Sequence, residues 1–185
     1  MAQGAEIDGV VEGARSVALL RGINVGPTTK VPMAVLRTAF EEAGATDVVT
    51  VLNSGNVVFT GNVDTAALEK QIACETGVTT TILVIDAVRF RRIAAAFPFE
   101  GDESKLTITF MSSVPAHVEV PDGLAPELVA IGAEAAYQWM PDGISKTKLK
   151  PSFWRQFGRD ATARNLRTVS RLLVLLDDTA AGNLS

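Results

Sequence analysis

The stretch DVVTVLNSGNVVFT at residues 47–60 decides the fold of this chain. Two β-branched segments, residues 47–52 and 56–60, enclose the residues NSG. β-Branched residues favour strands, whereas Asn, Ser and Gly favour turns. The pattern therefore predicts a β-hairpin, and the segments on either side of it indicate which kind of sheet the hairpin joins.

Strands and helices alternate around this hairpin. Before it, an apolar strand at residues 17–20 leads to a helix that begins at Pro32 and ends at Gly44, since proline is common in the first helical turn and glycine after the last. After it, a helix over residues 64–76 leads to a strand in TTTILVID. The order strand, helix, strand, strand, helix, strand is that of a ferredoxin-like βαββαβ plait.

The second half of the chain indicates a smaller α/β unit. A helix over residues 86–97, a strand in KLTITFMS and two short strands in ELVAIGAEAAYQWM are expected. We therefore predict an α+β fold in which the ferredoxin-like half (16–86) packs on a second α/β plait-like half (87–177). No linker-like segment separates the halves, and the residues show no repeat. Residues 1–15 and 178–185 are expected to form a flexible extension and a flexible tail.

Composition excludes several classes of protein. The 185 residues include one cysteine, Cys74, and one histidine, His117, which disfavours disulfides, cysteine-based zinc sites and Ser-His-Asp hydrolases. No metal site is predicted. The formal net charge of -4 argues against a protein coated with nucleic acid. There is no secretory signal, and no apolar run is long enough to cross a membrane, so we expect a soluble, cytoplasmic protein without a membrane partner.

Two polar loops are expected to meet at one edge of the first sheet. In a plait the first and second strands run in the same direction, so the loop after the first strand and the tip of the hairpin emerge together. This places Arg21, Gly22, Asn24 and Gly26 opposite Asn53, Ser54, Gly55 and Asn56. The glycines by themselves are explained by tight turns. The charge of Arg21, at the end of an apolar strand, requires a partner or solvent.

The C-terminal region is basic. Eight of the 17 Lys and Arg residues lie between Ser145 and Arg171, where Asp160 is the one acidic residue. Thr162 is predicted to cap the last helix, which puts Arg164 in its first turn, where a bound anion would offset the unfavourable interaction with the helix dipole. A solvated helix face is the alternative explanation of these charges.

Four blocks, VALLRGINVG, KVPM, LNSGNVVF and SKTKL followed by TARNLRTV, resemble the signature blocks of an uncharacterised bacterial family, domain of unknown function 1697. The resemblance covers roughly residues 16–176 and implies two plait-like α+β halves but no activity. Leu166 stands where the family usually has tryptophan, and Pro27 where it usually has a glycine or a polar residue. If that tryptophan stacks on a ligand, this chain binds the ligand more weakly. The motif residues implied by the resemblance are Arg21, Gly22, Asn24, Gly26, Lys30, Ser54, Gly55, Asn56, Ser145, Lys148, Leu149, Thr162, Arg164 and Asn165.

The first functional hypothesis is a small anionic ligand, such as a nucleotide or a phosphorylated metabolite, bound in a cleft between the halves. Cations would neutralise its charge, and amides and hydroxyls would orient it. The predicted ligand-binding residues are Arg21, Asn24, Lys30, Asn53, Ser54, Asn56, Lys148, Thr162, Arg164 and Asn165. The sequence names no cofactor or reaction. Because no pair of acid–base groups is evident, any catalysis would act by positioning and electrostatic stabilisation.

Two alternatives stay open. One is a module that binds RNA or single-stranded nucleic acid, for which Phe59 is the sole aromatic residue on the first-half strands and a poor platform for base stacking. The other is an interaction or structural protein, in which the motif residues hold the loops and the arginines are solvated. The sequence does not indicate an oligomeric state.

Overall fold

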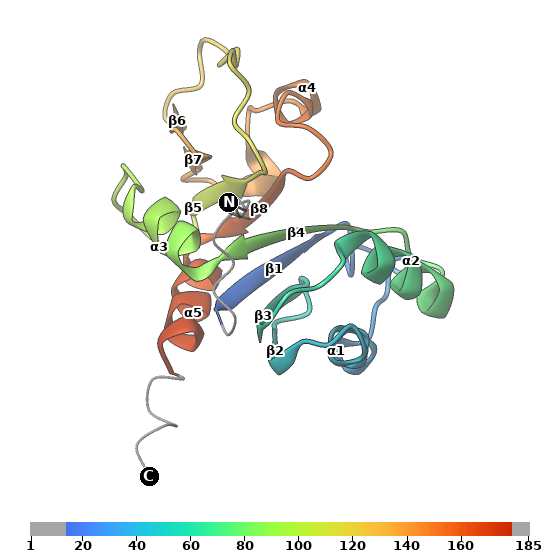
Figure 1. Cartoon of the computed structure of the whole chain (residues 1–185). Helices are drawn as coiled ribbons and strands as arrows, with labels where there is room; N and C mark the ends of the chain where they lie inside the picture. Colours follow the sequence, from blue (N-terminus) through green and yellow to red (C-terminus); the bar gives the residue numbers. More distant parts are fainter. Residues whose placement is uncertain (1–13, 179–185) are drawn as a thin grey trace, which may run out of the picture.

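The computed structural model describes residues 14–178 and contains two four-stranded sheets and five α-helices (Figure 1). The predicted α+β fold is confirmed. Residues 1–13 of the expected extension and 179–185 of the expected tail lie outside the described range. No helix within that range is long and apolar enough to cross a membrane.

The first half has the predicted order of elements. They are β1 (Arg15–Arg21), α1 (Met33–Glu42), β2 (Thr46–Val51), β3 (Asn56–Thr60), α2 (Thr65–Thr76) and β4 (Thr81–Asp86). The sheet order is β2-β3-β1-β4, and every neighbouring pair is antiparallel. The β2–β3 hairpin therefore forms as predicted. Because β1 and β2 are both antiparallel to β3, they run in the same direction.

The second half repeats this strand order. Its elements are α3 (Ala87–Ala95), β5 (Leu106–Phe110), β6 (Leu128–Ile131), β7 (Ala135–Trp139), the 3-10 helix η1 (Ile144–Lys146), α4 (Pro151–Arg155), β8 (Thr162–Asn165) and α5 (Leu166–Asp177). The sheet order β6-β7-β5-β8 matches that of the first half, strand for strand. In place of a helix corresponding to α1, residues 111–127 form a long loop. The halves are thus related in topology without an internal sequence repeat.

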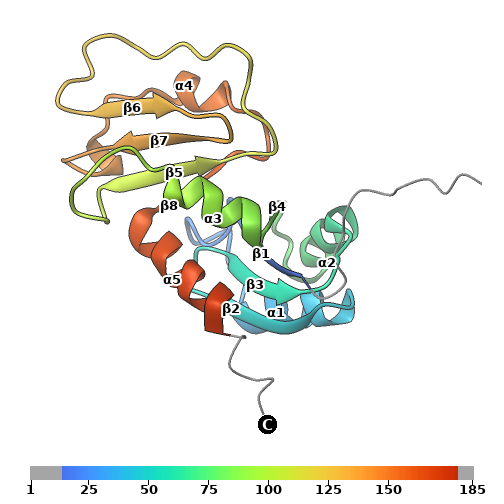
Figure 2. The same cartoon turned by 60° about the vertical axis from the view of Figure 1, so that its left-hand side comes forward.

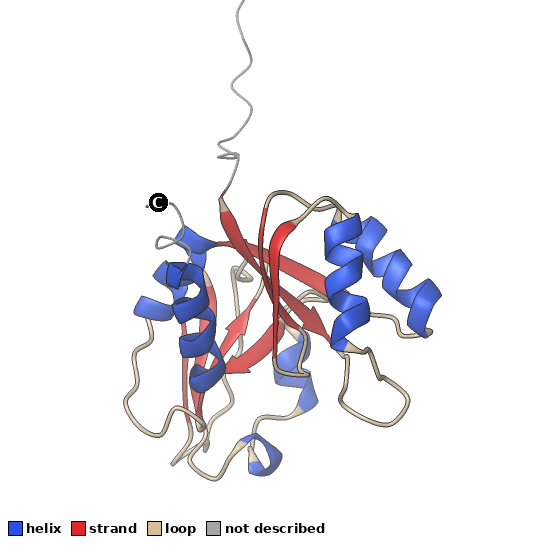
Figure 3. Cartoon of the chain, turned by 90° about the horizontal axis from the view of Figure 1, so that it is seen from below, coloured by secondary structure: helices blue, strands red, loops and turns tan. Residues whose placement is uncertain are grey.

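Three apolar cores divide the molecule into layers. The central core joins both sheets to α3 and α5, which lie between the sheets (Figure 2). A second core fills the space between the first sheet and the pair α1 and α2, and a third packs α4 and the long loop on the outer face of the second sheet. Figure 3 shows the two helix pairs on opposite sides of the first-half strands. The halves therefore share one continuous interior.

Both faces of β1 are buried, which explains its uninterrupted apolar run. Val17 and Leu19 face the central core, whereas Ala18 and Leu20 face the core beneath α1 and α2. β1 ends at Arg21, where the polar and glycine residues of the following loop begin.

The hairpin turn requires a glycine at position 55. Gly55 has φ 74°, and a Cβ on it would lie 2.7 Å from Cδ1 of Ile23. A side chain at this position would therefore be both strained and crowded.

The prediction for the start of the last helix is wrong. Thr162 does not cap it, because residues Thr162–Asn165 pair with β5 as an edge strand, with Arg164 opposite Ile108. The cap is Asn165, whose side chain accepts a hydrogen bond from the Thr168 N–H at 3.0 Å. Arg164 consequently lies in a strand and not in the first helical turn, so the dipole argument for an anion beside it no longer applies.

Candidate functional site

The loop after β1 and the tip of the β2–β3 hairpin meet, as the topology predicts. The Asn24 side-chain amide donates to the Asn53 carbonyl at 2.7 Å and to the Val31 carbonyl at 3.1 Å, and it accepts from the Val31 N–H at 3.0 Å. Asn24 has φ 54°, a conformation that asparagine adopts more readily than most residues. Its side-chain amide therefore closes the loop, and both its oxygen and its nitrogen are hydrogen-bonded to the backbone.

Arg164 connects the two halves. Its side chain leaves β8 and reaches the ends of β1 and of the hairpin, where every guanidinium nitrogen meets a protein acceptor. Nη2 donates to the carbonyls of Leu20 (2.8 Å), Ser54 (3.1 Å) and Gly55 (3.1 Å), Nε donates to Oδ1 of Asn56, and Nη1 donates to Oγ1 of Thr162 (2.7 Å) and to the Ala163 carbonyl (2.9 Å).

The environment of this arginine is unusual because it contains no carboxylate partner. Arg164 is 8% exposed, and all its bonds go to carbonyls, an amide and a hydroxyl. Burial lowers the pKa of Arg164 from 12.5 to about 10, which leaves the group charged at neutral pH. Its charge is therefore stabilised by neutral dipoles, in the way that a bound cation would be.

Four predicted site residues form this arrangement, which we call the junction network: Asn56, Thr162 and Arg164, which are buried, and Ser54, which is exposed. Asn56 is fully buried, and its Nδ2 donates to the Val51 carbonyl at 2.8 Å and to the Ser54 hydroxyl at 2.9 Å. The structure thus brings these four residues together. Their polar groups are bonded to one another and to the backbone.

Arg21 occupies a different environment, at the surface between the halves. Its Nη1 donates to the carbonyls of Arg159 at 2.8 Å and Gly158 at 3.2 Å, in the loop between α4 and β8. Nε and Nη2 make no hydrogen bond with any residue from 14 to 178. The charge of Arg21 therefore faces solvent and the loop, and its Nε and Nη2 groups are available as hydrogen-bond donors.

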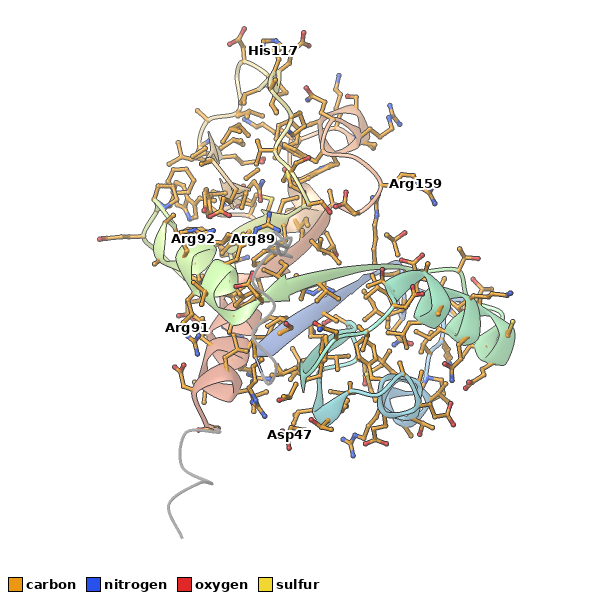
Figure 4. All side chains as sticks on the ribbon, in the orientation of Figure 1. Asp47, Arg89, Arg91, Arg92, His117 and Arg159 are labelled. Carbon is orange, nitrogen blue, oxygen red and sulfur yellow. The ribbon has the colours of Figure 1, made fainter. Side chains whose placement is uncertain are left out.

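A shallow, open groove lies beside Arg21 where the halves meet. Its volume is about 340 Å³, and it is lined by Arg21, Gly22, Thr79, Thr80, Thr81 and Arg159. Arg159 extends from the loop that leads into β8 (Figure 4). Arg21 and Thr81 are cross-strand neighbours, and the Thr80 hydroxyl donates to the Arg21 carbonyl at 2.8 Å. We call this the arginine groove.

The acidic residue nearest in sequence to the groove is held outside it. The carboxylate of Asp160 accepts a hydrogen bond from the Ser112 N–H at 2.7 Å and does not line the groove. Burial acts to raise the pKa of Asp160, but the hydrogen bonds with Ser112 and the charge of Arg21 outweigh it, so the pKa is lowered. The lining of the groove is therefore cationic and polar.

Three other predicted site residues lie around a second depression, of about 410 Å³, beside the start of α1. Asn24, Lys30 and Asn53 line it together with Gly26, Val31, Pro32 and Met33. Lys30 is exposed and is the one cation in the lining. Pro32 precedes the helix and provides no side-chain cap for its N–H groups. This depression and the arginine groove are lined by different residues.

Lys148 and Asn165 are not brought to either place. Lys148 lies in the outer layer of the second half, where its backbone N–H donates to Glu127 at 2.7 Å and its ammonium group donates to the Ala125 carbonyl. Asn165, the cap of α5, lines a separate small cavity. The ten predicted site residues thus divide among five places, and the sequence did not separate them.

The three arginines of α3 are paired with carboxylates. On α3, Arg89 and Arg92 both bind Glu134, and Arg91 binds Asp177 at 2.6 Å (Figure 4). The hydrogen bond from Arg92 is the main reason that the pKa of Glu134 falls to about 2, with a smaller contribution from Arg89. These pairs join α3 to the turn between β6 and β7 and to the end of α5, and they lie outside the predicted site.

The one aromatic residue considered for the nucleic-acid alternative, on the first-half strands, lies inside the protein. Phe59 is fully buried, with its ring centroid 5.2 Å from that of Phe40 on α1. Within residues 14–178, the exposed large hydrophobic side chains include no aromatic. His117 is exposed on the long loop (Figure 4).

Sequence reasoning missed Arg159 and the three threonines of the groove. Arg159 was visible as part of the basic C-terminal stretch, and Thr79–Thr81 as a run of hydroxyls at the start of the segment TTTILVID. Nothing in the spacing related the two segments, because they meet across the interface between the halves. Leu166, at the position where the family usually has tryptophan, packs against the central core.

The family described as "Protein of unknown function (DUF1697)" matches residues 14–135. Among solved structures, the conserved bacterial protein SP0830 from Streptococcus pneumoniae is similar, with a TM-score of 0.66 and 23% sequence identity over 89% of this chain and 99% of that one. That likeness supports the fold. No curated protein matches the chain. Since the match spans more than half of the residues, the chain belongs to the DUF1697 family of proteins of unknown function.

Proposed function

We propose that this protein binds a small anionic ligand, through a phosphate or carboxylate group, in the arginine groove between its halves. One observation carries the proposal. Arg21 and Arg159, which come from different halves, line a single groove together with three threonines and no carboxylate. Guanidinium groups form strong, charge-assisted hydrogen bonds with phosphates and carboxylates.

The contacts of Arg21 support a double role. Through Nη1 it holds the loop that carries Arg159, and so brings a second cation into the same groove. Through Nε and Nη2 it keeps donors for a ligand. Two cations in one groove repel each other, and a bound anion would convert that repulsion into attraction.

The threonines would complete the recognition of the ligand. The hydroxyl groups of Thr79 and Thr81 make no hydrogen bond within the described residues, whereas the hydroxyl of Thr80 donates to the Arg21 carbonyl. Two hydroxyls therefore accompany two guanidinium groups, a combination suited to the several acceptor oxygens of a phosphate. The ligand would be held by hydrogen bonds from these hydroxyl and guanidinium groups and by the charges of the two arginines.

The motif residues divide between two roles under this proposal. Arg21 would bind the ligand, whereas the junction network would act structurally, since its polar groups already bond to the protein. This assigns Ser54, Asn56, Thr162 and Arg164 to the role of holding the halves together so that Arg21 and Arg159 face the same space.

Thermal unfolding in the presence of inorganic phosphate and a panel of nucleotides tests the proposal, with sodium chloride at equal ionic strength as the reference. We expect a rise in Tm for the wild type that is lost in Arg21→Ala and in Arg159→Ala, because ligand binding to the folded state stabilises it. Arg37→Ala, which removes an exposed arginine on α1, is the matched control and should respond like the wild type.

A comparison variant, Lys30→Met, separates the groove from the depression beside α1. It should keep the full response. The proposal fails if the wild type shows no rise beyond the salt reference, or if Arg21→Ala and Arg159→Ala keep the whole rise.

A further inference from the structure

The outer face of the second sheet carries a row of polar residues across three strands. The register places Thr107 of β5 opposite Gln138 of β7 on one side and opposite Asn165 of β8 on the other. Thr107 is 5% exposed, and Gln138 is fully buried. Buried polar groups cost free energy unless they are hydrogen-bonded.

Donors in this row lack partners among residues 14–178. Nε2 of Gln138 is buried and unpaired, although its Oε1 accepts from the Thr109 hydroxyl at 3.2 Å. Oδ1 of Asn165 accepts two hydrogen bonds from Thr168, at 3.0 and 2.8 Å, so its remaining polar group is the Nδ2 donor. The Thr107 hydroxyl makes no hydrogen bond with any described residue.

A small cavity opens at one end of this row. Its volume is about 160 Å³, room for about five water molecules. The residues that line it are Ser104, Lys105, Thr107, Met140, Ile144, Ala163 and Asn165. It lies where β8 ends, whereas the arginine groove lies beside the loop before β8 begins.

The cavity is cationic. Lys105 is half-buried and makes no ion pair within the described part of the chain. No Asp or Glu occurs among the lining residues, and the exposed carboxylate of Asp102 pairs with Arg167 at 3.7 Å. Gly143, just before η1, comes so near to the lysine that a Cβ on it would lie 3.4 Å from Nζ.

From this arrangement we infer that the cavity is a second binding site, for the carboxylate or phosphate group of a small molecule. The ammonium group of Lys105 supplies the charge, and Nδ2 of Asn165 and the hydroxyl of Thr107 donate hydrogen bonds. An oxyanion accepts several such bonds at once, and those to an ionised partner are the stronger ones. Binding therefore gives partners to donors that the protein itself leaves unpaired.

Titration of the ¹⁵N-labelled full chain with inorganic phosphate, with acetate and with sodium chloride tests the site by NMR. We expect phosphate or acetate, but not chloride, to shift the amide signals of Thr107, Gly143 and Asn165, including the Asn165 side-chain amide. The anion that binds more tightly identifies the preferred group. Lys105→Met should weaken binding by about tenfold or more, because it removes a charged hydrogen-bond donor.

Thr107→Val, which keeps the shape of the side chain, should weaken binding by about threefold or more, because a neutral hydrogen bond contributes less. Lys150→Met, at an exposed lysine outside the lining, should bind like the wild type. In Arg21→Ala the signals of Thr107, Gly143 and Asn165 should shift as in the wild type, although binding in the arginine groove is lost. This last result separates the cavity from the proposed function.

The inference is overturned if neither anion shifts these signals beyond the chloride reference, or if Lys105→Met and Thr107→Val bind as tightly as the wild type. Should Lys105→Met not fold, unchanged binding by Thr107→Val is enough to overturn it.

Discussion

Arg164 and Arg21 stand at the same meeting of the two halves and differ in almost every physical respect. Arg164 is 8% exposed, and its guanidinium nitrogens all bond to protein acceptors. Arg21 is exposed and uses one nitrogen to hold a loop. An arginine side chain thus joins the two halves inside the protein in one place, and has donors available for a ligand in the other.

The difference follows from the direction of each side chain. In β8, Arg164 lies on the face that is turned to the first half, so its guanidinium enters the space between the sheets. Arg21 ends β1 and points past the edge of the sheet toward the loop that carries Arg159. Burial requires that the polar groups of an arginine be satisfied, whereas exposure does not.

The largest effect is expected from Arg164→Ala. It leaves the carbonyls of Leu20 and Ser54 and Oδ1 of Asn56 without the Arg164 donor, whereas the Gly55 carbonyl still accepts from the Leu20 N–H. Because three acceptors each lose a hydrogen bond from a charged donor, we expect the free energy of unfolding to fall by about 3–5 kcal/mol, measured by urea denaturation. Arg164→Lys should not restore the stability, since one ammonium group cannot reach all these acceptors.

Arg171→Ala on α5 serves as the control for this experiment, because its arginine is exposed and should change stability little. A loss below about 1 kcal/mol for Arg164→Ala would contradict its role in joining the two halves.

A smaller effect is expected at the arginines that have a carboxylate partner. Glu134→Gln removes the charge that pairs with Arg89 and Arg92, and should lower the free energy of unfolding by about 1 kcal/mol or less at neutral pH, because the site is partly exposed. The pKa of Glu134 is lowered from 4.5 to about 2 in the folded state. Its contribution is therefore complete above the unfolded pKa and is lost as the pH falls through about 2.

Urea denaturation of Glu134→Gln and of the wild type, at neutral pH and at about pH 2, checks this dependence. The difference in stability between the two should shrink in acid. Glu41→Gln, at an exposed glutamate of α1, should show no such change. A difference that is equal at both pH values would exclude the ion pairs as its cause.

The smallest effect on stability is expected from Arg21→Ala. Its two hydrogen bonds are at the surface, where water can replace them. We expect the free energy of unfolding to fall by about 0.5 kcal/mol or less, again by urea denaturation. A loss of unfolding free energy as large as that of Arg164→Ala would show that both arginines stabilise the contact between the halves to the same extent. It would contradict the ligand-binding role that the groove proposal gives to Arg21.

The two halves show what a pattern of residues can and cannot predict. In the first half, the β-branched hairpin and the helix signals at Pro32 and Gly44 were sufficient to predict the plait. In the second half, Thr162–Asn165 carries local signals for a helix start yet forms an edge strand. Its pairing with β5 overrides them, and that pairing joins segments about fifty residues apart, which local patterns do not encode.

For the candidate site, topology predicted the meeting of two loops, and the hydrogen bond between Asn24 and Asn53 shows that they meet. The predicted ligand-binding residues are nevertheless spread over several places. The sequence could not distinguish Arg164 from Arg21, because both follow apolar or alternating residues. It could not identify Arg159 as a partner of Arg21 either, because 137 positions lie between them and no periodicity links them.

By itself, then, the sequence of this protein determined the βαββαβ plait, the α+β class and the family, because these depend on local periodicity, turn chemistry and motif spacing. The tertiary structure alone decided which polar groups are satisfied within the protein and which stay available for a ligand. The physical reason is that burial and hydrogen bonding are properties of segments packed together. The packing of the second sheet on the first encloses Arg164 and leaves Arg21 and Arg159 in an open groove.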